Sequence, residues 1–271
     1  MSLHNSGTIL LVGAGKMGIA MAQGWLAAGL EGKSLVLVDP QPHETVRALA
    51  ESVGASLQTQ LPDTPPRAVV LAVKPQMMDT VLPAVRPLMG EATMALSIAA
   101  GIPLARLQSG LGSAKVVRSM PNTPAQLGKG ISGAFAGPDI SSDDRALAHA
   151  LLEAAGRVVW LENEALIDAV TSVSGSGPAY VFYLVEAMAA AGEQQGLAAD
   201  QAMALARQTI IGAAALLEAD PADAAQLRRN VTSPNGTTQA ALDVLMADDG
   251  LGPLLDRAVT AARKRSEELG Q

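Results

Sequence analysis

The stretch TILLVGAGKMG, residues 8–18, decides how the rest of the sequence is interpreted. Its apolar run from Ile9 to Val12 predicts a strand. The strand leads directly into the pattern Gly13-x-Gly15-x-x-Gly18, and an apolar helical segment follows. In a Rossmann βαβ unit the first glycine permits a tight turn, the second lets the backbone approach a pyrophosphate, and the third lets helix pack closely on strand. The helix N-terminus then points free N–H groups at the phosphates.

The segments around this glycine pattern strengthen the case for a dinucleotide site. A second strand is predicted over residues 34–39, and it ends in Asp39, about 20 residues beyond the last glycine, where an acid of this fold accepts a hydrogen bond from a ribose hydroxyl. A glycine-rich βα turn without a ligand is the alternative. Because strand, helix and acid all accompany the glycines, the sequence favours a dinucleotide site.

Composition excludes several classes of protein. A chain of 271 residues predicts two domains, and 49% hydrophobic with 2% aromatic residues predicts a core of small aliphatic side chains. A net charge of −7 without a basic tract argues against a nucleic-acid partner. The absence of cysteine excludes disulfides, thiolate metal sites and thiol nucleophiles. The N-terminus does not resemble a signal peptide, and no apolar run reaches the length of a membrane span. We therefore expect a soluble cytoplasmic protein with no membrane partner.

Strand-like and helix-like segments alternate in the first part of the chain, which predicts a doubly wound sheet. The strand-like runs are mostly continuous and apolar, as in parallel strands covered on both faces. They lie at residues 8–12, 34–39, 68–73, 93–98, 115–118, 131–135 and 157–161. Strand signals stop near Leu161, and we expect a dinucleotide-binding domain over 1–162 and an all-helical domain over 163–271.

Within the helical half, residues 178–192 are apolar nearly all round. A helix without a polar face is buried in a core or in a subunit interface. Because a small helical domain cannot surround it, we favour an interface, and hence a homodimer or a larger homo-oligomer. Another helix is predicted to begin at Pro221 with Asp220 as its N-cap.

The helical half also lacks side chains that many oxidoreductases need. The histidines are His4, His43 and His149, and no lysine lies between residues 130 and 263. Oxidation of an alcohol requires a group that removes the hydroxyl proton, usually His, Lys or a Tyr/Lys pair. A zinc site is equally disfavoured, so we expect no bound metal. A protonated imine, by contrast, accepts hydride without a strong general acid and needs only orientation, a hydrogen bond near nitrogen and an anion clamp.

Polar loops could meet those needs. Residues 231–238, VTSPNGTT, place hydroxyls and backbone N–H groups at a helix N-terminus, where a carboxylate can bind. An ordinary Ser/Thr N-cap is the alternative, as it is for VSGSGPA at 173–179. In the first domain AVKP at 72–75 closes a strand, and Lys74 there either contacts the cofactor or is merely solvated. The loop RSMPNTP at 118–124 is either the floor of a nicotinamide site or plain turn chemistry.

Together and in order, GAGKMG, AVKP, SIAAGI, RSMPNTP, VSGSGPAY and NVTSPNGTT closely resemble pyrroline-5-carboxylate reductases, over essentially the whole chain. The resemblance implies an N-terminal Rossmann domain and a helical dimerisation domain. It also implies NAD(P)H-dependent reduction of L-Δ1-pyrroline-5-carboxylate to L-proline at a site shared between protomers.

The resemblance implies roles for individual residues as well. Ser233, Gly236 and Thr237 would hold the substrate carboxylate, and the Thr238 hydroxyl would bond the ring nitrogen as the catalytic group. Residues that would contact the cofactor pyrophosphate are Gly13, Gly15, Lys16, Met17 and Gly18. Those that would flank its nicotinamide half are Ala72, Val73, Lys74, Pro75, Met120, Pro121 and Asn122.

Two details of the sequence qualify this picture. The family usually has SPGG where this chain has Asn235, which tolerates a positive φ but brings a side chain to the carboxylate pocket. Asp39 favours NADH over NADPH, because a carboxylate repels a 2′-phosphate. No arginine follows it before Arg47, although His43 or a backbone nest could still accept a phosphate.

Two other functions remain open from sequence. A β-hydroxyacid dehydrogenase shares the GxGxMG opening but needs a catalytic lysine in its helical domain, and none is present. A non-catalytic NAD(P)-binding regulatory protein is compatible with the fold, but it has no use for the SPNGTT and MPNTP loops.

Overall fold

The computed structural model describes residues 3–270, which form two compact units. The sheet unit comprises the chain up to Ser176 together with residues from Ala262 onward, and the helical unit comprises Gly177–Ala261. The sequence predicts a domain boundary at 162/163, and the compact units group residues 163–176 and 262–270 with the sheet. The segment that follows Leu161 and the last turns of the final helix pack with the sheet, so strand composition alone does not mark where the unit ends.

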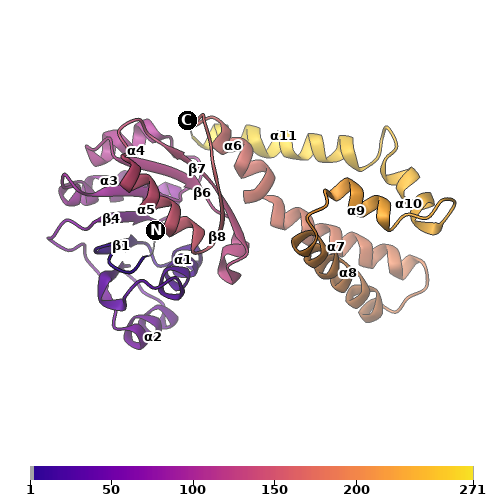
Figure 1. The fold of residues 1–271 in the computed structure, drawn as a ribbon, viewed down its shortest axis with the longest axis horizontal. Helices are drawn as coiled ribbons and strands as arrows, with labels where there is room; N and C mark the ends of the chain where they lie inside the picture. The colour runs from indigo at the N-terminus through magenta and orange to yellow at the C-terminus, as the bar shows by residue number, and fades with distance from the viewer. Residues whose placement is uncertain (1–2, 271) are drawn as a thin grey trace. The chain divides into compact units, whose positions relative to one another are not determined.

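One eight-stranded sheet forms the centre of the sheet unit, in the order β3-β2-β1-β4-β5-β6-β7-β8 (Figure 1). Its strands are β1 (Ile9–Val12), β2 (Leu35–Val38), β3 (Ser56–Gln58), β4 (Ala68–Leu71), β5 (Met94–Ser97), β6 (Val116–Met120), β7 (Gly130–Ala136) and β8 (Gly156–Trp160). Strand order reverses between β1 and β4, and the crevice at the carboxyl ends of such a pair is where open α/β sheets bind ligands.

Two features of this sheet differ from the sequence prediction. β3 was not predicted, because it is three residues long and carries no apolar run. β7 is antiparallel to β6, and β8 is parallel to β7, so this pair runs against the other strands. Residues 121–129 connect β6 to β7 with only one short 3₁₀ turn, η4 (Thr123–Leu127), and a parallel crossover needs a dozen or more residues.

Alternate residues of the central strands face two separate cores, as expected for a sheet covered on both sides. Ile9 and Leu11 pack with α1 (Lys16–Ala27), α2 (Glu44–Val53) and α5 (Ser142–Glu153). Leu10 and Val12 pack with α3 (Met78–Val85) and α4 (Leu104–Leu111). Short 3₁₀ turns η1 (Gly32–Ser34), η2 (Pro75–Met77) and η3 (Arg86–Leu88) complete the layers.

The chain leaves the sheet unit through α6 (Leu166–Val170) and a π-helical turn, η5 (Thr171–Gly175). The sequence predicts a Gly/Ser turn here, and the structure shows a nearly continuous helical path instead. The hydroxyls of Thr171 and Ser174 donate to the carbonyls of Ile167 and Val170, at 2.9 and 3.1 Å. Bonds of this kind, from Ser or Thr to the carbonyl four residues earlier, often bend a helix.

The helical unit contains α7 (Gly177–Gln194), α8 (Ala199–Ala219), α9 (Ala224–Asn230), α10 (Thr237–Leu245) and the beginning of α11 (Leu251–Leu269). The predicted helix start at Pro221 is wrong. Asp220 accepts the Ala222 N–H in a local turn at 2.9 Å, and Asp223 is the true N-cap, accepting from Gln226 N at 2.7 Å.

Large apolar side chains remain exposed on the helical unit. On α7, Phe182 is 64% and Tyr183 70% exposed in the single chain, and only Ala189 of this helix is buried. Among residues 3–270, α8 is the one helix long and apolar enough to meet a bare length-and-hydropathy test for a membrane span, which the sequence analysis had not expected of any segment. A helix that packs against other protein meets the same test.

Candidate active site

The three glycines of the first turn occupy three different environments. Gly13 has a φ of +94°, and a Cβ placed on it would lie 2.8 Å from the Ala72 carbonyl oxygen. A Cβ on Gly18 would collide with the Gly13 carbonyl oxygen. A Cβ on Gly15, in contrast, would meet no atom within 4 Å. Gly13 thus makes the turn, Gly18 permits helix–strand contact, and Gly15 leaves open space for a ligand.

Asp39 joins the end of β2 to this turn. Its Oδ2 accepts a hydrogen bond from Ala14 N at 3.0 Å, and its Oδ1 accepts one from Gln41 N at 2.9 Å. A carboxylate has about four lone-pair positions, so Asp39 can accept further donors such as ribose hydroxyls. The two backbone bonds fix this negative charge beside the glycine turn.

Positive charge lies at the same edge of the sheet. Lys16 begins α1, and Gly15, its N-cap, offers no side-chain cap. The positive end of the helix dipole repels a lysine at the helix N-terminus, unless an anion binds there. Lys74 follows β4 and precedes η2, which begins at Pro75. Both lysines are exposed, and neither forms an ion pair in the part of the chain that the structure describes. A pyrophosphate would match both the helix end and these charges.

The structure shows how the other predicted cofactor residues are arranged. Ala72 N donates to the Val12 carbonyl oxygen at 2.8 Å, and Val73 packs under Gly13. The half-buried Met17 packs with the core that contains α1. These residues, with Asp39, Lys74 and Pro75, therefore meet at the ends of β1, β2 and β4. The geometry fits a dinucleotide, because it combines an open glycine, an uncapped helix end and a fixed acid.

The Met120–Asn122 segment leaves β6 further along the same edge. Pro121 and Asn122 are buried, and the Asn122 side chain is used inside the protein: Nδ2 donates to the Ser174 carbonyl oxygen at 3.1 Å, and Oδ1 accepts from Ile131 N at 2.9 Å. A Cβ on Gly175 would lie 2.8 Å from Met120 Cε. The segment thus packs on η5, a contact that the sequence did not indicate.

The predicted substrate loop belongs to the helical unit. Gly236 N donates to the Ser233 carbonyl oxygen at 3.0 Å, and Asn235 has a φ of +58°. Asn235 therefore adopts the left-handed conformation that asparagine tolerates, and its side chain is exposed. Gly236 is the N-cap of α10 and provides no side-chain cap, so the first N–H groups of this helix lack such a partner.

The hydroxyls of this loop differ in their partners. Thr232 Oγ1 donates to the Arg228 carbonyl oxygen at 2.7 Å. Within residues 3–270, the hydroxyls of Ser233, Thr237 and Thr238 form no hydrogen bond. Three free hydroxyls beside a helix N-terminus suit a small ligand that carries a carboxylate and a polar nitrogen.

Comparisons with known proteins identify the family. Residues 164–269 match a family model described as pyrroline-5-carboxylate reductase dimerisation, and residues 8–101 match one described as NADP oxidoreductase, coenzyme F420-dependent. A pyrroline-5-carboxylate reductase of Pseudomonas aeruginosa is 42% identical and aligns over 97% of this chain and 97% of its own length. The chain belongs to the pyrroline-5-carboxylate reductase family.

Solved structures of pyrroline-5-carboxylate reductases have the same fold. The reductase of Coxiella burnetii is 33% identical, with a TM-score of 0.91 over 98% of this chain and 100% of its own. The Plasmodium falciparum enzyme, solved with NADP bound, is 26% identical, with a TM-score of 0.81 over 99% and 100% of the two chains. The predicted resemblance, the fold class and the use of NAD(P)H are confirmed.

The dimerisation model also explains the exposed apolar side chains of α7, because it covers that helix. The prediction of a homo-oligomer is confirmed by this match.

Sequence reasoning gave no role to one residue of the sheet unit, Arg118. It is 4% exposed in β6 and pairs with Glu164, 46 positions further along the chain. The sequence did contain a sign of this role, because a charged arginine stands within the apolar strand-like run VVRSM.

Proposed function

We propose that this protein reduces L-Δ1-pyrroline-5-carboxylate to L-proline with NAD(P)H. Membership of the reductase family supports the reaction. The observation that carries the proposal is the set of free hydroxyls on Ser233, Thr237 and Thr238. An alcohol dehydrogenase needs a base, whereas the helical unit contains neither histidine nor lysine. A cyclic iminium with a carboxylate needs only the hydrogen-bonding groups that this loop offers.

In this proposal each residue has a limited task. Bound NAD(P)H supplies the hydride, and the glycine turn with Lys16 holds its phosphates. Ser233, Gly236 and Thr237 bind the substrate carboxylate through hydroxyl and N–H groups, helped by the positive end of the α10 dipole. The Thr238 hydroxyl accepts a hydrogen bond from the protonated ring nitrogen and orients it. Because that nitrogen is already protonated, these side chains need not supply a proton during reduction.

For the cofactor we propose a preference for NADH over NADPH. Asp39 is held by two backbone N–H groups, so its charge cannot easily turn away from a 2′-phosphate. His43 is exposed, and its Nδ1 already caps α2 by accepting from Thr45 N at 3.3 Å. Nε2 of His43 remains available to donate a hydrogen bond to a 2′-phosphate. We therefore expect the enzyme to use NADPH as well, but more slowly than NADH.

We further propose that the enzyme acts in the cytoplasm as a homodimer or a larger assembly, with no nucleic-acid or membrane partner. The dimerisation domain supports the assembly, and the acidic composition supports the absence of nucleic acid. Cell fractionation with size-exclusion chromatography tests both statements, and recovery of the enzyme with membranes would contradict them.

The test of function is turnover by the purified full-length protein. NADH and NADPH are each mixed with pyrroline-5-carboxylate, nicotinamide absorbance is followed, and proline is measured directly. We expect turnover with both, and faster turnover with NADH. Binding of NADH without turnover would favour a regulatory protein instead. A β-hydroxyacid dehydrogenase would be favoured if the protein oxidised a β-hydroxyacid with NAD⁺ and did not reduce pyrroline-5-carboxylate with either NADH or NADPH.

A further inference from the structure

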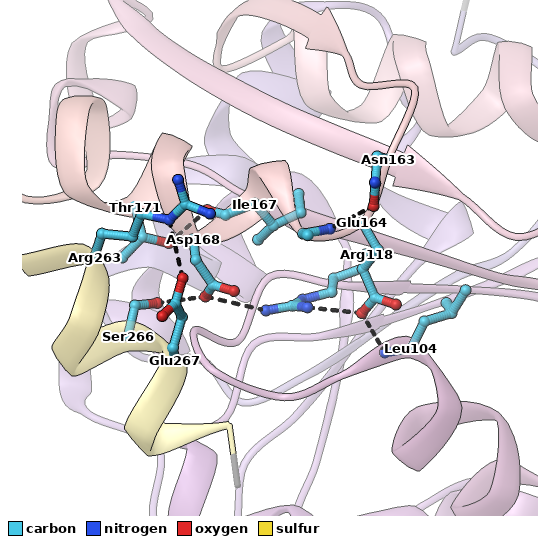
Figure 2. A network of polar contacts seen from close by, with 11 residues as sticks. Leu104, Arg118, Asn163, Glu164, Ile167, Asp168, Thr171, Arg263, Ser266 and Glu267 are labelled. Atoms are coloured by element: carbon cyan, nitrogen blue, oxygen red, sulfur yellow. Dashed lines mark hydrogen bonds and ion pairs between the residues drawn. The ribbon is translucent and has the colours of Figure 1, made fainter. Parts of the chain in front are cut away.

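Arg118 is the centre of a buried polar network in the sheet unit (Figure 2). Its Nη1 lies 2.7 Å from Glu164 Oε1, and its Nη2 lies 3.9 Å from Asp168 Oδ1. Within residues 3–270 its Nε has no hydrogen-bond partner. Burying a guanidinium is unfavourable unless it is paired, so the two acids must accompany it.

Both acids belong to the outgoing connection, the segment through which the chain leaves the sheet unit. Glu164 precedes α6, and Asp168 lies within it. Glu164 Oε1 also accepts a hydrogen bond from Leu104 N at 2.6 Å, which joins it to the start of α4. A Cβ on Gly133 of β7 would lie 2.6 Å from Val170 Cγ2, so α6 packs directly on the sheet. The outgoing connection is thus fixed by charge and by close packing.

The same network reaches the returning connection, the last turns of α11. Ser266, which is 5% exposed, donates a hydrogen bond to Asp168 Oδ1 at 2.7 Å (Figure 2). Close to the end of α11, Leu269 and Gly270 pack on Gly101, which follows β5 and has a φ of +73°. A Cβ on Gly101 would lie 3.3 Å from Leu269 Cβ. One arginine therefore links both connections, through Asp168, to the middle of the sheet.

We propose that Arg118 is a positioning residue for the reduction. It holds the outgoing and returning connections at fixed places on the sheet unit and so limits the motion of the helical unit, which carries the substrate loop. This inference rests on the proposed function. A buried ion pair is weak evidence for stability, and conformational specificity is the better-attested reason for keeping one. Small displacements of a reacting group are costly, because hydride transfer needs close and aligned atoms.

The chain offers a matched control for this idea. Arg67 Nη2 pairs with the buried Asp144 at 2.7 Å, and its Nη1 donates to the Ala92 carbonyl oxygen at 3.1 Å. This pair also belongs to the sheet unit, but it contacts neither α6 nor α11. Arg67→Met and Arg118→Met each remove a guanidinium that is bound to a carboxylate. Only Arg118→Met removes one that contacts the outgoing connection and, through Asp168, the returning one.

The experiment compares Arg118→Met, Arg118→Lys, Ser266→Ala and Arg67→Met in the full-length protein. We measure the Kd for NADH by fluorescence, kcat and KM for pyrroline-5-carboxylate, and amide hydrogen exchange over residues 262–270. For Arg118→Met we expect unchanged NADH affinity, faster exchange in that segment and kcat/KM lowered about 10- to 100-fold. Ser266→Ala should lower kcat/KM by a smaller factor, about threefold, because Arg118 and both acids stay in place, and Arg118→Lys should recover part of the activity.

The outcomes separate the possible explanations. Arg67→Met should leave kcat/KM and exchange in 262–270 unchanged. If Arg118→Met does not fold, Ser266→Ala alone decides, and unaltered kinetics together with faster exchange in that variant would overturn the proposal. A parallel loss of NADH affinity would also overturn it, since Arg118 would then support the cofactor site. A wild-type protein without turnover would refute the proposed function, while exchange over 262–270 would still report whether Arg118 fixes the returning connection.

Discussion

The free hydroxyl of Thr238 gives the sharpest test of the proposed chemistry. It forms no hydrogen bond within residues 3–270, although it lies in the first turn of α10. Thr238→Ala therefore breaks no bond of the fold, and we expect little change in the free energy of unfolding. Any large loss of activity must then come from an interaction with the substrate.

The magnitude follows from the charge on that substrate. A hydrogen bond to a charged group contributes about 1.5–3 kcal/mol. Since about 1.4 kcal/mol is a factor of ten in rate, Thr238→Ala should lower kcat/KM about 10- to 150-fold. As hydride arrives, the ring nitrogen loses its charge and develops a lone pair to which the Thr238 hydroxyl can donate. That bond forms only as the amine does, so kcat should fall by more than KM rises.

The assay is steady-state oxidation of NADH with pyrroline-5-carboxylate, with thermal unfolding measured in parallel. Thr238→Ser keeps the hydroxyl and should retain most of the activity. Thr232→Ala is the matched control from the same loop: its hydroxyl bonds Arg228, so its loss should cost about 1 kcal/mol of stability with kcat nearly unchanged. Wild-type kcat in Thr238→Ala, or an equal loss in Thr232→Ala, would refute the role assigned to Thr238.

Three further predictions concern the rest of the molecule. Asp39→Asn should shift the kcat/KM ratio toward NADPH by about tenfold, because a repulsive charge is lost while an amide oxygen remains for Ala14 N; an unchanged ratio would show that Asp39 does not select the cofactor. Phe182 is 64% exposed, and Phe182→Asp should weaken the dimer by about 2 kcal/mol or more. The oligomer is followed by light scattering at falling protein concentration, and an oligomer that persists as in the wild type would contradict this. Burial raises the pKa of Asp144, but the hydrogen bond from Ser141 and the Arg67 ion pair outweigh it and hold that pKa below its usual value. The stability that Asp144 contributes is therefore complete at neutral pH and lost as pH falls through the lowered pKa, so the Tm difference between wild type and Asp144→Asn should vanish in acid.

The sequence predicted most of the sheet and the cofactor turn, because their signals are local. Gly13, Gly15 and Gly18 each meet a requirement set within a few residues, and the structure gives each the expected environment. The sequence also indicated that asparagine at position 235 tolerates a positive φ, and the structure gives it one. The roles of the substrate-loop residues stay predictions.

Features that depend on distant parts of the chain were not predictable in this way. The apolar run of β7 does not reveal its direction, which follows from the short connection after β6. The Arg118 network joins residues far apart in sequence, and no spacing rule connects them. The sequence also did not indicate that the Asn122 side chain binds backbone groups of Ser174 and Ile131. Its contact with the cofactor stays a prediction.

The division of the sheet unit into two stretches of sequence has a consequence for synthesis on the ribosome. Residues 177–261 are translated before the segment that contains Ser266 and Leu269, so the earlier stretch must wait for its last packing partners. At about 5–20 residues per second that delay is on the order of ten seconds. During this interval Asp168 lacks the hydrogen bond from Ser266, and Gly101 lacks the contact with Leu269. The nascent enzyme therefore can complete its nucleotide-binding half only after the oligomerisation helices have emerged.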